Sequence, residues 1–365
     1  MPVSDHRPST EAFASAFKAK LALSYLPALD GIRAVAVFLV IFYHFGFSRV
    51  PGGTGVTIFF VLSGFLITWL LLRENEKDGT ISLKKFYRRR ILRIFPAFYA
   101  YWLGLVLLMT VTGKTMVWPQ AISALLYVTN YYNIIFGDPN TGFSHTWSLS
   151  IEEQFYLLWP FVFLWLINDL KKMTVLLVCI IIAVWIHRVI LYSVFDVWQG
   201  YFYEAFDTRM DSLMMGCLVA VLLRRGVMMP FWKILCYNQF MPLIILALLT
   251  VSIYCEQGFI PRYRDVVGLA VNPLLIALFL VQMLNLSSFY IWRWIDWPVM
   301  RYLGRLSYSL YLYQQITLGG AKKLFVHESV LVQLIAAVAV TVIVAACSYH
   351  IIELPFLKLK NTIYK

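Results

Sequence analysis

A histidine and an arginine share one apolar stretch of the chain, DGIRAVAVFLVIFYH, from Asp30 to His44. Ten residues separate Arg33 from His44, so on a helix they lie about 16 Å apart along the axis, roughly half of a hydrocarbon core some 30 Å thick. An ionisable group inside a membrane span is a candidate functional residue, although a single histidine in an apolar helix is as often a core residue. Histidine suits a general base near neutral pH, and guanidinium binds phosphate. Asp30 is either a helix-start cap or a partner for Arg33, one turn away.

A second basic cluster stands at the entrance to a later apolar stretch, in FYRRRILRIFPAFY. Arg90 and Arg93 are three residues apart, so they share one face of a helix. This density of arginines exceeds what membrane topology needs, and it suits a phosphorylated donor. A hydroxyl group that attacks an acyl thioester needs a general base, so the arginines and the histidine together predict acyl transfer.

Carboxylates occur at the outer ends of two other apolar stretches. In HTWSLSIEEQFYLLWP (145–160), Glu152 and Glu153 are adjacent, and adjacent helical residues point about 100° apart. We therefore do not expect both to face one pocket, and a salt bridge to a neighbouring span is the structural alternative. In FDTRMD (206–211), Asp207 and Asp211 lie on one side of a helix, and pairing with Arg209 is the structural alternative.

Two further segments can each be interpreted in two ways. Segment 113–147 carries several tyrosines and asparagines and contains His145; aromatic faces and amides suit sugars, and an interfacial aromatic belt is equally compatible. Ser63 and Gly64, in FFVLSGFL, either let two helices approach closely or leave room for a narrow ligand.

The composition predicts membrane helices as the elements that position these groups. Of the 365 residues, 61% are hydrophobic and 14% are charged, with a mean hydropathy of +0.72. Such a chain is too apolar for a soluble domain, and backbone pairing in lipid favours helices. We expect an all-α polytopic membrane protein with about ten transmembrane helices, near 31–49, 55–73, 94–112, 148–168, 173–192, 208–224, 234–254, 266–286, 303–320 and 330–352. The ninth is short and polar, so it is predicted to face the protein interior.

The basic residues predict the orientation. With a cytoplasmic N-terminus, inward segments hold 22 of the 31 lysines and arginines and outward segments hold eight, which favours both termini inside. The net charge of +12 is therefore a topology and lipid-headgroup signal rather than a sign of nucleic-acid binding. The five cysteines are scattered without metal-ligand spacing, so we expect neither a metal nor a disulfide. Expected domains are a tail at 1–25, a transmembrane domain at 26–356 and a tail at 357–365.

The stretches quoted above, together with FDTRMDSLMMGCL, GRLSYSLYLYQQ and YHIIELPF, resemble the acyltransferase-3 family of integral membrane O-acyltransferases. The resemblance covers residues 26–360. It implies about ten spans and the transfer of acyl groups, usually acetyl, from cytoplasmic acyl-CoA to surface sugars or other hydroxyl acceptors.

The family motifs fall on particular residues of this chain. The basic-X10-His motif falls on Arg33 and His44, the Arg-X-X-Arg motif for the CoA end on Arg90 and Arg93, and the SGF element on Ser63, Gly64 and Phe65. The acidic position falls on Glu152, and the DTRxD motif on Asp207, Arg209 and Asp211. The chain departs from the family at Gln314 and Gln315, where many relatives read SYxxYLxH, and at Leu354, which stands between Glu353 and Pro355. Both departures weaken any role for the last two spans.

The resulting hypothesis is O-acylation at the outer face of a bacterial cytoplasmic membrane. His44 is the expected base or transient acyl carrier, with Arg33 and Glu152 assisting, and Glu152 orienting or charge-stabilising His44. The expected donor, acetyl-CoA or another acyl-CoA, contacts Arg33, Arg90, Arg93, Ser63 and Gly64. The expected acceptor, a carbohydrate of lipopolysaccharide, exopolysaccharide, peptidoglycan or a similar compound, contacts His145, Trp147, Asp207, Arg209 and Asp211.

Other functions remain open at this stage. They are a transporter or flippase for a lipid-linked glycan, O-acylation of a small metabolite such as a macrolide, and a non-catalytic binding protein. The oligomeric state is open as well.

Overall fold

The computed structural model describes residues 9–23, 25–260 and 262–363. Within these ranges the chain is helical and has no strand, which confirms the all-α expectation. Residues 1–8 of the predicted N-terminal tail and residues 364–365 of the predicted C-terminal tail lie outside the described residues.

Each expected span coincides with a helix. These ten helices of the described chain are α2 (Pro27–Phe45), α3 (Gly52–Asp78), α4 (Leu83–Val111), α7 (Trp147–Leu166), α8 (Leu170–Ser193), α10 (Phe206–Arg225), α12 (Met241–Tyr254), α13 (Leu269–Leu286), α14 (Pro298–Leu324) and α15 (Val330–Ser348). The shorter helices are α1 (Thr10–Leu21), α5 (Trp118–Leu125), α6 (Thr129–Phe136), α9 (Gln199–Glu204), α11 (Met229–Leu235) and α16 (Leu354–Ile363). Short 3-10 or π segments are η1 (Ser144–Thr146), η2 (Cys255–Phe259), η3 (Arg264–Gly268), η4 (Arg293–Asp296) and η5 (Tyr349–Glu353).

Among the described residues, seven helical stretches are long and apolar enough to cross a membrane. They are Pro27–Phe45, Gly52–Asp78, Leu83–Val111, Leu170–Ser193, Met241–Gly258, Arg264–Leu286 and Val330–Leu359. The number is eight if one pair bent by 115°, Gln199–Arg225 with Met229–Leu235, counts as a single span. Helices α7 and α14 are long but are not among these stretches. The architecture indicates a multi-pass membrane protein, whereas ten spans and two cytoplasmic termini stay predictions.

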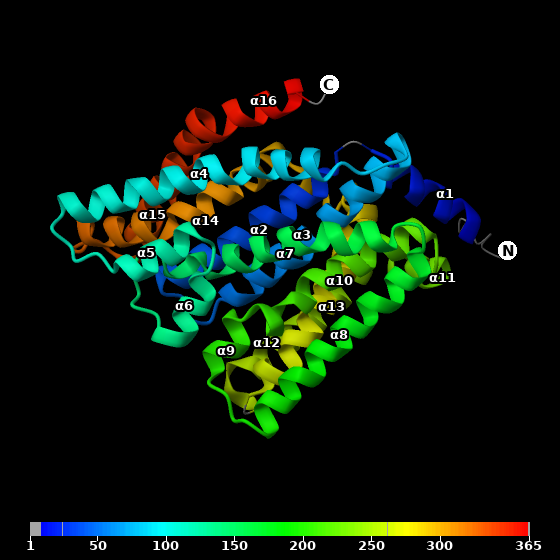
Figure 1. The fold of residues 1–365 in the computed structure, drawn as a ribbon, viewed down its shortest axis with the longest axis horizontal. Coiled ribbons are helices and arrows are strands. Elements are labelled where there is room, and N and C mark those ends of the chain that lie inside the picture. Colours follow the sequence, from blue (N-terminus) through cyan, green and yellow to red (C-terminus); the bar gives the residue numbers. More distant parts are fainter. Residues whose placement is uncertain (1–8, 24, 261, 364–365) are drawn as a thin grey trace.

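Helices α2 and α3 lie at the centre of the bundle (Figure 1). Pro27 opens α2 at the first helical position, where the N–H that proline lacks would have no helical partner. Both helices contribute to two apolar cores, one shared with α4, α7, α14 and α15 and the other with α10, α12 and α13. Figure 1 shows α1 and α11 at one end of the bundle and α5, α6 and α9 at the other. Helices α2 and α3 follow each other across a short connection and pack together as a hairpin.

Helix α14 confirms the prediction that the ninth span faces the interior. Its packing partners include α2 on one side and α15 on another. Its buried polar side chains are Ser307, Ser309, Tyr311, Gln314 and Thr317.

Two glycines let α3 and α10 touch backbone to backbone. A Cβ on Gly64 would lie 1.9 Å from the carbonyl oxygen of Leu213, and a Cβ on Gly216 would lie 2.0 Å from that of Val61. Of the two roles that the sequence left open for Gly64, the structure therefore favours close helix packing.

We expect Gly64→Ala to lower the melting temperature in detergent. The added methyl group would push two backbones apart, and overpacking of this kind costs about 1–3 kcal/mol. Gly104→Ala is the matched control, because a Cβ at that helical position meets nothing within 4 Å and alanine stabilises a helix relative to glycine. Equal thermal unfolding of Gly64→Ala and the unchanged protein would contradict the packing role.

Candidate active site

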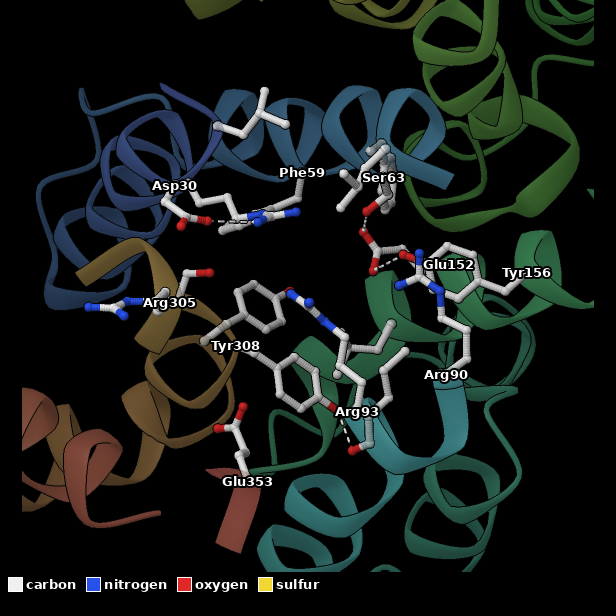
Figure 2. Close-up of a pocket in the computed structure, with 18 of the residues that line it drawn as sticks. Asp30, Phe59, Ser63, Arg90, Arg93, Glu152, Tyr156, Arg305, Tyr308 and Glu353 are labelled. Atoms are coloured by element: carbon white, nitrogen blue, oxygen red, sulfur yellow. Dashed lines mark hydrogen bonds and ion pairs between the residues drawn. The ribbon is translucent and has the colours of Figure 1, made fainter. Parts of the chain in front are cut away.

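A cavity of about 650 Å³ opens between α2, α3, α4, α7 and α14 (Figure 2). Its lining includes four guanidinium groups, those of Arg33, Arg90, Arg93 and Arg305. Its lining carboxylates are Asp30, Glu152, Glu153 and Glu353. Four cations around one cavity are suited to a ligand with several negative charges.

Arg33 is held at the cavity by Asp30. Its Nη1 lies 3.0 Å from an oxygen of the Asp30 carboxylate, and the hydroxyl of Tyr25 donates to the other oxygen at 2.7 Å. Asp30 is therefore the partner of Arg33, one of the two roles that the sequence allowed. The carboxylate neutralises Arg33 and fixes its direction.

Arg90 and Arg93 both line the cavity, as their spacing on one helix face predicted. The Arg90 guanidinium lies over the ring of Tyr156, 4.6 Å from its centroid. Figure 2 shows Arg93 beside Tyr308, whose hydroxyl donates to the carbonyl of Ile94 at 3.1 Å. Within the described residues, neither arginine forms a hydrogen bond or an ion pair with a carboxylate. Their N–H groups are available to a ligand.

Glu152 and Glu153 both line the cavity, so the expectation that only one would face it is wrong. The cavity wraps around α7 widely enough to include two directions that differ by about 100°. Ser63 donates to one oxygen of Glu152 at 2.9 Å, and Tyr156 donates to the other at 3.1 Å. Ser63 thus contacts the cavity, whereas Gly64 does not line it.

His44 lies near the C-terminal end of α2 and is not among the described residues that line this cavity. Its Nδ1 is 3.0 Å from the carbonyl oxygen of Val40. A carbonyl can only accept, so Nδ1 carries the proton, and the unprotonated Nε2 of the neutral ring is the base. No hydrogen bond or ion pair joins Glu152 to His44 in the described part of the chain. The Val40 carbonyl, not Glu152, therefore orients His44.

His145, in η1, lies near His44 in the interior. Its ring packs between those of Tyr101 and Tyr311, with centroids at 5.8 and 5.4 Å. Tyr311 also donates to the His145 carbonyl at 2.9 Å, which fixes η1 to α14. Burial, aided by the charge of His44, lowers the pKa of His145 to about 3. His145 is therefore neutral at physiological pH and offers one ring donor and one acceptor.

Asp207, Arg209 and Asp211 do not form the mutual cluster that the structural alternative required. Asp207 contacts His187 at 2.8 Å and the Tyr201 hydroxyl at 3.0 Å. Asp211 accepts from Arg188 at 2.6 Å in the protein interior. Arg209 is two residues from each aspartate and so points to the other side of α10. Asp207 and Asp211 share one side but lie a full turn apart, so they meet different neighbours.

Arg209 lies between aromatic rings. Its guanidinium is 5.4 Å from the ring centroid of Phe60 and 5.2 Å from that of Tyr203, and it donates to Thr57 at 3.0 Å. Trp147 packs on the same two rings, with centroids 6.3 and 4.9 Å away. Phe60 itself lines the cavity. Arg209 and Trp147 pack behind it and form a second layer of the cavity wall.

We expect Arg188→Leu to destabilise the protein by about 3–5 kcal/mol, because it leaves the buried Asp211 carboxylate without its cation. Thermal unfolding in detergent measures this loss. The double variant Arg188→Leu with Asp211→Leu removes both charges and is expected to recover most of the stability. A single variant as stable as the unchanged protein would contradict a structural ion pair here.

Sequence reasoning missed the contribution of the last two spans. Arg305, Tyr308 and Tyr311 of α14 and Glu353 of η5 all line the cavity. The expectation of a weakened role for these spans is therefore wrong for the shape of the site. The polar sequence of the ninth span, from which its interior position was predicted, could have indicated these residues.

A second cavity of about 1260 Å³ adjoins the first and shares Arg90, Arg93 and Trp69 with it. Further basic residues in its lining are Lys18, Arg73, Lys77, Lys85, Arg89, Arg224 and Arg225. Some are paired: Arg224 lies 2.8 Å from Glu76, and Arg89 pairs with Glu74. Within the described residues, no group of histidines, cysteines and carboxylates is arranged to hold a metal ion.

Comparisons with known proteins give a consistent result. A family model described as an acyltransferase domain matches residues 26–350. A peptidoglycan O-acetyltransferase of Listeria monocytogenes is 32% identical over 370 residues, which cover 92% of this chain and 56% of that protein. A putative peptidoglycan O-acetyltransferase of Bacillus subtilis is 32% identical over 91% of this chain and 55% of its own length. The chain thus spans about half the length of these curated relatives. No solved structure matches.

Proposed function

The chain belongs to the acyltransferase-3 family, and from this we propose that it is a membrane O-acyltransferase that moves an acetyl group from acetyl-CoA to a hydroxyl group of a cell-envelope carbohydrate. The observation that carries the proposal is the arginine-lined cavity built around α2, the helix that also bears His44. Peptidoglycan is the first acceptor to test, because two relatives are named for its acetylation. The proposed location is the cytoplasmic membrane of a bacterium.

The donor would bind with its phosphates at the arginines. Arg90 and Arg93 stand where the two cavities join, so a diphosphate held there leaves the nucleotide in the larger basic cavity and the acyl-bearing arm in the smaller one. The apolar side chains of Phe59 and Phe60 and the ring of Tyr311 line the smaller cavity. They suit the uncharged arm of coenzyme A.

The chemistry would take place at Nε2 of His44. In a direct transfer, this nitrogen takes the proton of the acceptor hydroxyl while the oxygen attacks the thioester carbon. The C–S bond then breaks, and the thiolate takes the proton from His44. In the other route, Nε2 attacks the thioester carbon, the C–S bond breaks and CoA leaves as the thiolate. The acceptor hydroxyl then takes the acyl group from Nε2, and its proton ends on the thiolate. Both routes need the tautomer that the Val40 carbonyl selects.

The decisive test uses purified protein in detergent with labelled acetyl-CoA and a peptidoglycan fragment, a polysaccharide or a small alcohol as acceptor. The proposal expects release of CoA together with label on the acceptor. A protein that releases no CoA with any hydroxyl acceptor but moves a lipid-linked glycan between liposome leaflets would be a transporter instead. Mass spectrometry of surface glycans with and without the gene then identifies the acceptor and the acyl chain.

A further inference from the structure

Gln314 continues the face of α14 that lines the cavity. Ser307 and Tyr311 line it, and Gln314 lies three residues beyond Tyr311, on the same helix face. Tyr311 is the last residue of α14 in the lining. Gln314 therefore stands one turn beyond the last α14 residue of the cavity lining, toward the C-terminal end of α14.

The same turn brings Gln314 next to His44. Helices α2 and α14 run parallel: Gly304 packs against the backbone of Asp30, and Lys322 donates to the carbonyl of Phe45. The His44 ring folds back by one turn to reach Val40, because helical side chains point toward the N-terminus. This places the ring at the level of Gln314, within range of its side-chain amide.

The Gln314 amide is buried without a well-aligned hydrogen bond. The residue is 0% exposed, and among the described residues neither Nε2 nor Oε1 forms a hydrogen bond of good geometry, although the His44 ring lies close enough to interact with the amide. A buried amide without partners is costly, and in a native protein such a group calls for an explanation. A ligand atom that arrives beside His44 would supply the missing partner.

We propose that the Gln314 side-chain amide binds the carbonyl oxygen of the acyl group and stabilises the negative charge that this oxygen gains during transfer. The inference rests on the proposed function and names a catalytic residue for it. An acyl group that passes beyond Tyr311 meets the Gln314 amide and the His44 ring together. The attacking atom adds to the carbonyl carbon, and the C=O electron pair moves to oxygen.

The Gln314 N–H donates to that oxygen while it is charged. When the C–S bond breaks, the carbonyl re-forms and the thiolate leaves. Glutamine neither gains nor loses a proton in these steps, so the amide serves equally in direct transfer and in transfer through His44. Its donor is strongest where charge develops in a site shielded from water.

The test compares Gln314→Met, Gln314→Leu and Gln314→His with the unchanged protein in the labelled acetyl-CoA assay. Methionine and leucine remove the donor, and we expect kcat to fall about 100-fold with an unchanged KM for acetyl-CoA, whose phosphates bind elsewhere. Histidine restores an N–H donor, and we expect it to recover most of kcat. Because the amide forms no well-aligned hydrogen bond at rest, the melting temperatures of the methionine and leucine variants should be equal to or above that of the unchanged protein.

Gln282→Met is the matched control. Gln282 is also fully buried, but it donates to the Leu235 carbonyl at 2.9 Å and lies outside both cavities. We expect this variant to lose stability and to keep kcat, the reverse of Gln314→Met.

If Gln314→Met keeps full kcat, or loses kcat only in proportion to lost folded protein, the assignment of Gln314 is overturned. If the unchanged protein itself transfers no acyl group, the proposed function fails, and that result is distinguishable from failure at Gln314 alone.

Discussion

His44→Ala is expected to lower kcat for acyl transfer by about 10²–10⁴-fold, the contribution of a positioned general base. The variant removes Nε2, the nitrogen that the Val40 carbonyl leaves unprotonated. The side chain is exposed at the C-terminal end of α2, so its truncation leaves no buried charge behind. Membrane insertion and the melting temperature should therefore stay unchanged. Initial rates with labelled acetyl-CoA, measured on protein of verified folding, give the answer.

Two comparison variants test whether the expected loss of activity comes from the chemistry of His44. His44→Gln keeps a polar side chain that cannot take a proton, and it should be as inactive as alanine if proton transfer or covalent transfer is the role of His44. His327→Ala removes an exposed histidine outside both cavities, and its kcat should equal that of the unchanged protein. Normal acylation by His44→Ala would remove His44 from the mechanism.

Arg93→Met is expected to raise the KM for acetyl-CoA by about 10–100-fold, since a hydrogen bond to a charged group contributes about 1.5–3 kcal/mol. In the described part of the chain Arg93 forms no ion pair with a carboxylate, so the variant breaks no salt bridge, although the charge of Arg93 also acts on the buried Glu353. Arg33→Met would be less informative, because it also leaves Asp30 without its cation. The kcat of Arg93→Met should change little, because the proposed transfer takes place beyond Tyr311, at His44. Steady-state kinetics over a range of acetyl-CoA concentrations measure both constants.

Arg88→Met is the matched control for Arg93→Met. Arg88 belongs to the same basic run, but it is exposed and lines neither cavity. The Arg88→Met variant removes the same charge. Its KM therefore shows how much of the change comes from the loss of long-range attraction of the donor, which salt screens. Equal KM values for the Arg93 and Arg88 variants would mean that the cavity does not hold the phosphates.

The sequence by itself determined the features that depend on spacing along one helix. The 61% hydrophobic composition required helices in lipid. The three-residue spacing of Arg90 and Arg93 put both on one face, and the structure places both at the cavity. The same local geometry allowed Asp30 to pair with Arg33, one of the two roles left open for it, and the polar ninth span predicted the interior position of α14. These relations follow from a rise of about 1.5 Å and a turn of about 100° per residue.

Only the tertiary structure decided which neighbours those faces meet. Glu152 faces Ser63 and the arginines rather than His44, and Asp211 pairs with Arg188 rather than Arg209. Arg305 and Tyr311 reach the site from α14, some 270 residues after α2 begins, because α14 packs parallel to α2 with Gly304 against Asp30. The spacing within a helix fixes the direction of a side chain relative to that helix alone. Its partner depends on how helices far apart in sequence pack, and close backbone contacts such as that of Gly64 with α10 set that packing.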